Sequence, residues 1–167
     1  MHEMTKQNLQ SAFAGESQAH MKYMIFSEIA EKEGKKNIAR LFKAIAYAEL
    51  VHAKNHLKTL GGIGSLKEIL ETAKKGEVFE VEEMYPVYNN DAKFQGEKDA
   101  EKSTYYALEA EKLHIELYQH ALEQEEKGND LDDEKIYVCP ICGYTAKGNA
   151  PDTCPICKAK KEIFKQF

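Results

Sequence analysis

The sequence has no excess of positive charge and no long hydrophobic run. Its 167 residues include 23 Lys and Arg against 28 Asp and Glu, for a net charge of -5. Such a chain offers no basic surface to phosphate backbones or anionic lipids, so we expect neither nucleic acid nor a membrane as a partner. No stretch approaches the roughly 20 apolar residues that cross a bilayer, and residues 1–10 are polar, which indicates no signal for export.

Cysteine is missing from most of the chain. All four cysteines lie between Cys139 and Cys157, where they form two Cys-x-x-Cys pairs. This spacing is typical of metal ligands, whereas the disulfides of a secreted scaffold are spread along the chain. We therefore expect a protein of the reducing cytoplasm.

Proline is scarce before the C-terminal part. The only proline before residue 127 is Pro86, and this part is rich in Ala, Glu, Lys, Leu and Tyr, which favours long helices. Pro86 should kink its helix or break the hydrogen-bond ladder locally. Hydrophobic periodicity predicts helices over residues 5–33, 37–60, 66–75, 77–94 and 97–126. The expected fold class is an all-α four-helix bundle.

The C-terminal segment has a different character. Pro140, Pro151 and Pro155 accompany the cysteines there, in a turn-rich segment with too little apolar bulk to fold without a metal. The polar residues 127–134 indicate a linker. We predict a helical domain over residues 1–130 and a small metal-bound domain of short strands and turns over residues 131–167.

The predicted inward faces of the helices contain charged residues among apolar ones. These residues are Glu16, Glu49, His52, Glu111 and His114. An unpaired carboxylate costs several kcal/mol to bury even after relaxation, and several carboxylates at one depth repel one another. Nearby lysines such as Lys43 and Lys54 fall on the polar side of their helix, so a bound metal is the better source of positive charge.

The spacing of these residues favours the same conclusion. Residues three apart lie on one face of a helix, so Glu49 with His52 and Glu111 with His114 each present an oxygen and an imidazole nitrogen together. One Glu from each of two helices plus Glu-x-x-His from each of the other two is the donor set of ferritin-like di-iron and di-manganese bundles. One such pair arises often by chance on charged helices, but two pairs with suitably placed partners predict a two-metal site.

Several roles stay open at this point. Periodicity does not choose among Glu77, Glu80, Glu82 and Glu83 on the helix that contains Pro86. Tyr23 could hydrogen-bond a ligand carboxylate or be an ordinary packed tyrosine. His20 and His56 fit hydrogen-bonded core residues or supports for the ligands better than ligands.

The four cysteines predict a closed tetrahedral site. Cys139, Cys142, Cys154 and Cys157 form two matched knuckles, each able to direct two sulfurs at one ion. Four thiolates suit zinc and iron alike. Zinc would make the domain structural, and iron would make it a one-electron carrier.

Several motifs stand together in this chain: Ala12-Phe13-Ala14-Gly15-Glu16-Ser17-Gln18-Ala19, Ala48-Glu49-Leu50-Val51-His52-Ala53, Glu80-Val81-Glu82-Glu83-Met84-Tyr85-Pro86, Ala110-Glu111-Lys112-Leu113-His114, and the two Cys-Pro-Ile-Cys knuckles. Over essentially its whole length the chain resembles the rubrerythrin family. The resemblance implies a ferritin-like bundle with a di-iron centre, a rubredoxin domain, and activity as a peroxide reductase, often described as an NADH peroxidase.

The resemblance also implies site residues. The di-iron ligands it implies are Glu16, Glu49, His52, Glu80, Glu83, Glu111 and His114. One iron is expected to shift on reduction between Glu83 and His52. The cysteines match the rubredoxin ligands, which favours iron over zinc. We expect Glu16, Glu49, His52, Glu83 and Tyr23 to take part in catalysis.

The expected reaction is the two-electron reduction of hydrogen peroxide, with electrons relayed by the four-cysteine iron from an NAD(P)H-dependent reductase or a rubredoxin-type carrier. The resemblance implies a head-to-tail homodimer in which each thiolate site serves the bundle of the neighbouring subunit. The connection over residues 61–76 is short compared with that of some family members, so the helical hairpins either pair within one bundle or are exchanged between subunits. A ferroxidase or iron-handling protein and a zinc-ribbon binding module remain as alternatives.

Overall fold

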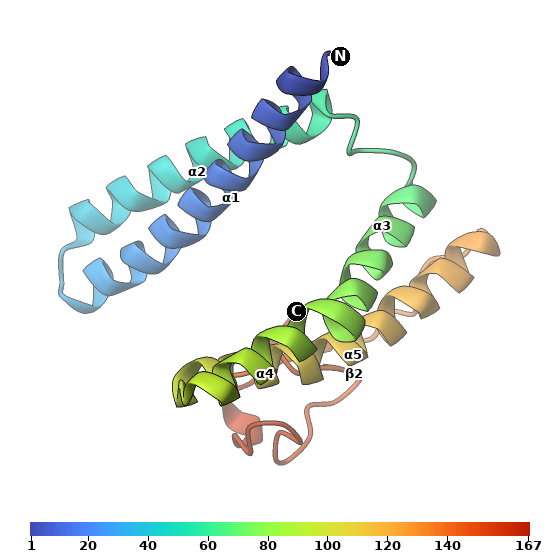
Figure 1. Ribbon diagram of the computed structural model, residues 1–167. Helices are drawn as coiled ribbons and strands as arrows, with labels where there is room; N and C mark the ends of the chain where they lie inside the picture. The colour runs from blue at the N-terminus through green and yellow to red at the C-terminus, as the bar shows by residue number, and fades with distance from the viewer. The chain divides into compact units, whose positions relative to one another are not determined.

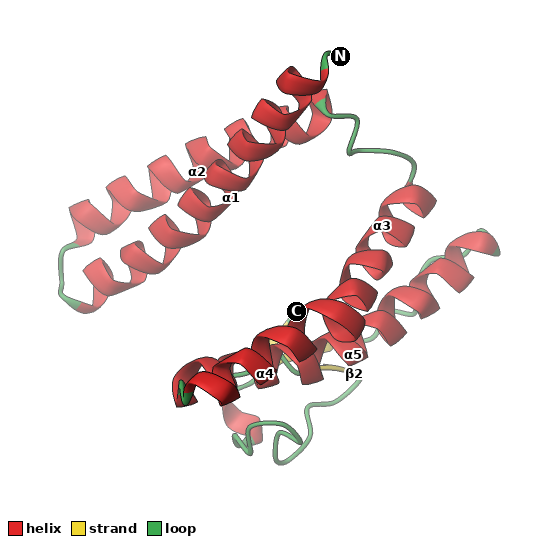
Figure 2. Ribbon diagram, viewed as in Figure 1, coloured by secondary structure: helices red, strands yellow, loops and turns green.

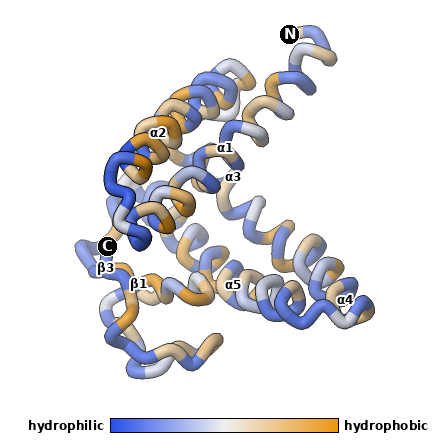
Figure 3. The backbone as a smooth tube through the Cα atoms, turned by 90° about the vertical axis from the view of Figure 1, so that its left-hand side faces the viewer, coloured by the Kyte–Doolittle hydropathy of each residue, from blue (hydrophilic) through white to orange (hydrophobic).

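The computed structural model describes all 167 residues as two compact units, Met1–Gly64 and Ser65–Phe167. Helices make up most of the chain, and strands occur only near the C-terminus (Figure 2). Along the helices hydrophobic and hydrophilic residues alternate, as a hydropathy colouring of the backbone makes visible (Figure 3). None of the helices combines the length and the apolar character that a membrane-spanning helix needs.

The first unit is a helical hairpin of α1 (Glu3–Lys32) and α2 (Lys36–Thr59), which lie side by side (Figure 1). Their bounds fall within a few residues of the predicted helices. Small residues line the contact: Ala39, Ala46 and Ala53 recur every seventh position of α2 and are buried. Small side chains allow a close approach of two helices, but they bury little apolar area.

Large apolar side chains of this hairpin therefore remain outside its own contact. Ile25, Phe26, Ile29, Leu41 and Ile45 are each at least 40% exposed. An apolar face of this kind is typical of a surface that packs against another element. The hairpin by itself thus buries only part of the apolar surface that its sequence provides.

The second unit begins with a helical run in three parts, followed by a long helix. The elements are α3 (Leu66–Phe79), the π-helix η1 (Glu80–Met84), α4 (Tyr85–Gln95) and α5 (Lys98–Glu126). Ser65 opens the run with a capping box, because its hydroxyl accepts from the Glu68 amide while the Glu68 carboxylate accepts from the Ser65 amide. The predicted interruption between residues 75 and 77 is wrong, since α3 continues through Gly76.

The break in this run lies just before Pro86 and takes the form of η1. A proline lacks the amide hydrogen that an α-helix needs and collides with the carbonyl four residues earlier. A π-helical turn is wider than an α-helical one and relieves that conflict by changing the hydrogen-bond register. The wider turn also rotates the residues after Glu80 relative to those before it, which matters for the carboxylates below.

The C-terminal part is a small sheet with a metal-ligand core. Its strands β1 (Ile136–Val138), β2 (Thr145–Lys147) and β3 (Lys165–Gln166) run antiparallel in the order β2-β1-β3, and a 3-10 turn, η2 (Lys161–Ile163), precedes β3. The core holds three buried cysteines with Tyr144, Ile156, Phe164 and the α5 residue Tyr106 around them. With so little apolar bulk, this part needs a metal to hold its fold. The predicted domain boundary after residue 130 stays a prediction.

Candidate metal centres

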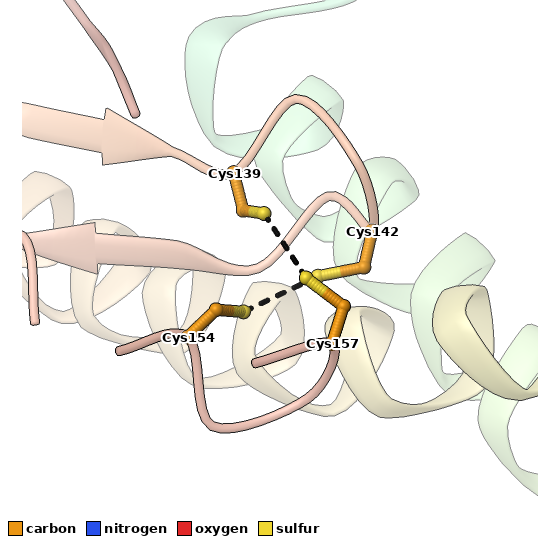
Figure 4. A group of neighbouring side chains, drawn as sticks. All are labelled: Cys139, Cys142, Cys154 and Cys157. Atoms are coloured by element: carbon orange, nitrogen blue, oxygen red, sulfur yellow. Dashed lines mark hydrogen bonds between the residues drawn. The ribbon is translucent and has the colours of Figure 1, made fainter. Parts of the chain in front are cut away.

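The four cysteine side chains point toward one another from two loops (Figure 4). The Cys139 and Cys157 sulfurs are 3.5 Å apart, as are those of Cys142 and Cys154, and no disulfide joins any pair. In a tetrahedral site with metal–sulfur bonds of about 2.3 Å, neighbouring sulfurs lie about 3.8 Å apart. The four thiols therefore fit a single iron or zinc ion with little rearrangement.

The two knuckles have the same backbone design. The Gly143 amide donates to the Cys139 carbonyl at 3.0 Å, and the Lys158 amide donates to the Cys154 carbonyl at 3.0 Å. Both Gly143 and Lys158 have positive φ angles, of 79° and 64°. Glycine adopts this conformation readily, whereas for Lys158 it is strained, so the second knuckle keeps its form against a local cost.

Backbone amides set the chemistry of the sulfurs. Burial by itself would raise the pKa of the Cys154 thiol, but the amides of Cys157 and Ile156 point at its sulfur and bring the pKa below its ordinary value. Burial raises the pKa of Cys142, which the Tyr144 amide opposes. Amides directed at the sulfurs stabilise thiolates, the form that binds a metal.

In the first unit, α1 and α2 bring Glu16, Glu49 and His52 together, with ligand atoms all within 4.8 Å of one another. His52 Nδ1 lies 3.0 Å from Glu49 Oε2 and 3.9 Å from Glu16 Oε1. The His52 side chain is 53% exposed, while that of Glu49 is 17% exposed. The predicted inward residues of this hairpin thus form one cluster, whose imidazole lies at its open side.

Other predicted residues of the first unit surround this cluster differently. Tyr23 packs its ring against Phe26 and Phe42, with centroids 6.3 and 6.1 Å away, and its hydroxyl makes no hydrogen bond to Glu16 or Glu49. The His20 ring donates from Nδ1 to the Ala46 carbonyl at 2.7 Å. His20 is thus a hydrogen-bonded link between α1 and α2.

In the second unit, α3 and α5 bring Glu77, Glu111 and His114 together within the same 4.8 Å limit. His114 Nδ1 is 2.5 Å from Glu111 Oε2, and the two side chains are 27% and 16% exposed. This cluster is more buried than the one in the hairpin.

The pKa values of two glutamates in the second unit are raised, because their carboxyl groups are partly buried and lie close to other carboxylates. Burial raises the pKa of Glu77 to about 7, aided by a hydrogen bond to Glu111 and by the charges of Glu111 and Glu80. Burial and the charge of Glu111 also raise the pKa of Glu80, although His114 opposes the shift. Acids in this state share protons when no cation is present, and a bound cation would replace those protons.

Tyr85 also belongs to this neighbourhood. Burial raises the pKa of its hydroxyl, and the charges of Glu80, Glu111 and Glu77 raise it further. The phenol therefore keeps its proton beside the carboxylates. Sequence reasoning missed this residue, although its place directly before Pro86, after a run of glutamates, was a usable signal.

The structure does not bring Glu83 into either carboxylate cluster. Glu83 is exposed and lies at a shallow surface depression with Phe79, Met84 and Val87, while Glu77 occupies the position by α5. The physical reason is η1: the wider π turn carries Glu83 away from the face of Glu80, whereas Glu77 and Glu80 keep the α-helical spacing of three. Helical periodicity left the choice among these glutamates open, and the family resemblance that named Glu83 does not record the π turn.

Each of the two clusters offers donors of the kind that a metal site requires. Each contains a Glu-x-x-His pair and at least one further carboxylate, all oxygen or imidazole donors suited to iron. The four-cysteine site packs against α5 in the second unit, where a Cβ built on Gly143 would lie 3.6 Å from the Ala110 Cβ. The four-cysteine site and a carboxylate cluster are thereby neighbours in one unit.

Comparisons with known proteins agree with this donor chemistry. A family model described as rubrerythrin matches residues 7–122, and one described as the rubredoxin-like domain of rubrerythrin matches residues 137–165. Rubrerythrin-2 of Clostridium acetobutylicum is 44% identical, over 98% of this chain and 97% of its own. Nigerythrin of Nitratidesulfovibrio vulgaris is 34% identical, over 98% of this chain and 86% of its own.

A solved structure extends the comparison to three dimensions. The fully reduced, all-ferrous form of nigerythrin matches with a TM-score of 0.59 at 34% identity, covering 98% of this chain and 86% of that one. Together with the helices and the small sheet, this match confirms the predicted fold class, a ferritin-like helical bundle with a small rubredoxin-like domain.

Proposed function

The chain belongs to the rubrerythrin family, an iron-dependent oxidoreductase family, and we propose that it reduces hydrogen peroxide to water. Its cofactors are two irons held by carboxylates and histidines and one iron held by four cysteines. The observation that carries the proposal is the packing of the four-cysteine site on α5 beside Glu111 and His114. An electron carrier at this position serves a centre that must be reduced again after each turnover.

We assign seven ligands to the di-iron centre. The hairpin supplies three of them and the second unit four, namely Glu16, Glu49, His52, Glu77, Glu80, Glu111 and His114. Glu77 takes the place among the ligands that the family resemblance gave to Glu83, and its support is its closeness to Glu111 and His114. The carboxylates balance the charge of the ions, which relieves the repulsion that raises the pKa of Glu77 and Glu80.

The chemistry needs two electrons and two protons for each peroxide, giving two water molecules. Two irons held by these residues would supply both electrons at one place, so that the O–O bond would break without release of a hydroxyl radical. Tyr85, whose hydroxyl keeps its proton beside the carboxylates, is the candidate for proton relay from the second unit. Tyr23 is the corresponding candidate from the hairpin. A reductase that draws on NAD(P)H, or a rubredoxin-type carrier, returns electrons one at a time to the cysteine-bound iron in the cytoplasm.

We further propose that two copies of the chain exchange their hairpins to complete the bundles. A ferritin-like bundle needs one long crossover between its halves. The helical segment from Glu49 to the end of α2 is about 15 Å long, and the segment from the start of α3 to Glu77 is about 16 Å long. A crossover that places Glu49 and Glu77 at the same height in one bundle must therefore span about 31 Å. The connection from Thr59 to Leu66 reaches about 25 Å at full extension.

The exchange also covers the apolar face of the hairpin with the second unit of another copy of the same chain. A connection too short for its own bundle favours pairing with the same element of a second copy, because every native contact is available there. The hairpin of one copy would then supply Glu16, Glu49 and His52 to the second unit of the other. The resulting homodimer has two di-iron centres, each built from both chains.

Co-assembly of two damaged chains tests the exchange. One carries Glu49→Ala with His52→Ala, and the other carries Glu111→Ala with His114→Ala. Half of the randomly assembled dimers are mixed, and each mixed dimer has one intact centre, so carboxylate-bound iron and peroxide turnover should return to about a quarter of the wild-type level. Each variant alone should show neither. No recovery on mixing would mean that each hairpin pairs within its own chain.

Stopped-flow oxidation of the reduced protein tests the reaction. Hydrogen peroxide should restore the visible bands of the ferric four-cysteine site at a rate that depends on an intact carboxylate centre. Glu49→Ala should lose this fast oxidation and keep the bands, because its four-cysteine site is untouched. Rapid consumption of dioxygen with growth of a ferric mineral, and slow reaction with peroxide, would instead identify an iron-storage activity.

A further inference from the structure

We propose that Thr145 is a positioning residue that orients His114 and connects it to the four-cysteine site of the same chain. The inference rests on the proposed di-iron function. His114 Nε2 lies 3.0 Å from Thr145 Oγ1, and Thr145 Oγ1 lies 3.0 Å from the Gly143 carbonyl oxygen. Gly143 directly follows Cys142. Two hydrogen bonds and one peptide unit therefore link a carboxylate-site imidazole to a sulfur ligand.

The direction of these hydrogen bonds fixes the proton on the imidazole. A carbonyl oxygen only accepts, so the single proton of the Thr145 hydroxyl points at Gly143. The hydroxyl oxygen must then accept from His114, which places a proton on Nε2. Nδ1, which faces Glu111 at 2.5 Å, is thereby the nitrogen left to bind a metal.

The fold holds Thr145 where this contact can form. Thr145 opens β2 and pairs with Val138 of β1, and β2 lies beside α5 (Figure 1). The knuckle next to it is seated on α5 at Ala110, which is 2% exposed. His114 comes four residues after Ala110 and three after Glu111, so it lies at the edge between the face that meets the knuckle and the face that carries the carboxylates.

These hydrogen bonds and the peptide between Gly143 and Cys142 give electrons a route between the two metal sites within one chain. A cysteine-bound iron would give one electron at a time to the carboxylate centre and become ferric each time, so two such transfers would balance the reduction of one peroxide. The expected head-to-tail dimer, in which each thiolate site serves the bundle of the neighbouring subunit, stays a prediction. In an exchanged dimer the bundle beside each four-cysteine site contains α1 and α2 of the partner, so both chains are served at once.

Three variants in the iron-loaded, full-length protein test the role of Thr145. Thr145→Val removes the hydroxyl at nearly constant volume, Thr145→Ser keeps it, and Thr153→Val is the control, since Thr153 is an exposed threonine of the same small domain. One readout is the affinity of the carboxylate centre for Fe(II), which does not depend on turnover. The other is the rate at which the reduced four-cysteine site is reoxidised by the peroxide-oxidised centre.

Thr145→Val should weaken Fe(II) binding by about 10- to 100-fold, the effect typical of removing a hydrogen-bond partner of a metal-bound histidine. It should also slow the reoxidation at least tenfold, while Thr145→Ser stays within about threefold of wild type in both and Thr153→Val matches wild type. Unchanged visible bands show that the small domain remains folded. Wild-type Fe(II) affinity in Thr145→Val would overturn the inference. Failure of wild type itself to react with peroxide would refute the proposed function, but it would leave the affinity comparison valid.

Discussion

The pair Glu49 and His52 on α2 and the pair Glu111 and His114 on α5 share one spacing but have different surroundings. The His52 side chain is 53% exposed and contacts carboxylates with one nitrogen. The His114 side chain is 27% exposed and engages both nitrogens, one with Glu111 and one with Thr145. The same motif therefore yields one exposed imidazole that is held at one nitrogen and one imidazole that is fixed from two sides.

This difference shows how a repeated motif can serve unequal metal positions. A histidine held at both nitrogens keeps its orientation before the metal arrives, whereas an exposed histidine can change rotamer at little cost. The cluster that contains Glu111 and His114, the fixed side, also adjoins the four-cysteine site. Chemistry that requires one ion to stay and the other to shift on reduction would use the two sides in this way.

The largest effect should come from removing the fixed imidazole. His114→Ala should lower the Fe(II) affinity of the carboxylate centre by at least about 100-fold, because it removes a preoriented ligand, and His52→Ala by about tenfold. Isothermal titration under anaerobic conditions measures both. His2→Ala is the matched control, since His2 is exposed before α1. Equal losses in the two ligand variants would break the comparison between the two sides.

The choice between Glu77 and Glu83 decides how many carboxylates lie around His114, and so how far this cluster differs from the one around His52. Glu77→Gln should reduce peroxide turnover and Fe(II) binding by about 10- to 100-fold, since it removes an anionic ligand beside Glu111. Glu83→Gln, on the exposed side of η1, should stay within about threefold of wild type. A larger loss in Glu83→Gln than in Glu77→Gln would refute the assignment.

The metal-free protein should show a pH effect from the fixed side. Glu77 has a pKa of about 7 in the folded protein against 4.5 as its ordinary value, so the folded state binds more protons between these values. The free energy of unfolding should therefore fall as pH rises from about 4.5 to about 7, by about 1 to 3 kcal/mol after allowance for solvent screening. Urea unfolding of wild type and Glu77→Gln measures the difference. A parallel pH dependence in both proteins would contradict the role of Glu77.

The smallest expected effect is on stability, and it concerns the hairpin that contains His52. Ser27 on α1 is fully buried, and its hydroxyl has no hydrogen-bond partner. Ser27→Ala should raise the stability of the protein by about 1 kcal/mol, because it removes an unsatisfied polar group without changing the small-residue contact. Thermal unfolding detects the shift, with Ser17→Ala as the control, since Ser17 already donates to the Phe13 carbonyl. A loss of stability in Ser27→Ala would reveal a hidden partner.

Much of the molecule follows from local pattern. The periodicity of apolar residues predicted the long helices, and it placed Glu49 with His52 and Glu111 with His114 on faces that the structure brings beside further carboxylates. The four cysteines meet because each knuckle is a local motif with its own backbone hydrogen bonds. Fold class and metal chemistry therefore depended on short-range information that one sequence contains.

The rest depends on interactions that a pattern does not record. The proposed choice of Glu77 over Glu83 rests on η1, the π turn just before Pro86. Thr145 meets His114 across 31 positions of sequence, so no helical or strand periodicity relates them. The helix through Gly76 persists because its neighbours outweigh a glycine penalty of about 1 kcal/mol.

The central claim is that the carboxylates of both units are held by iron, and metal counting in anaerobically reconstituted protein tests it most directly. The iron and zinc contents of the protein are measured first. The Mössbauer spectrum then separates iron bound to oxygen and nitrogen ligands from iron bound to thiolates. We predict about three irons per chain, two of them bound to oxygen and nitrogen ligands. A folded protein that takes up only one metal per chain, on its cysteines, would contradict the account.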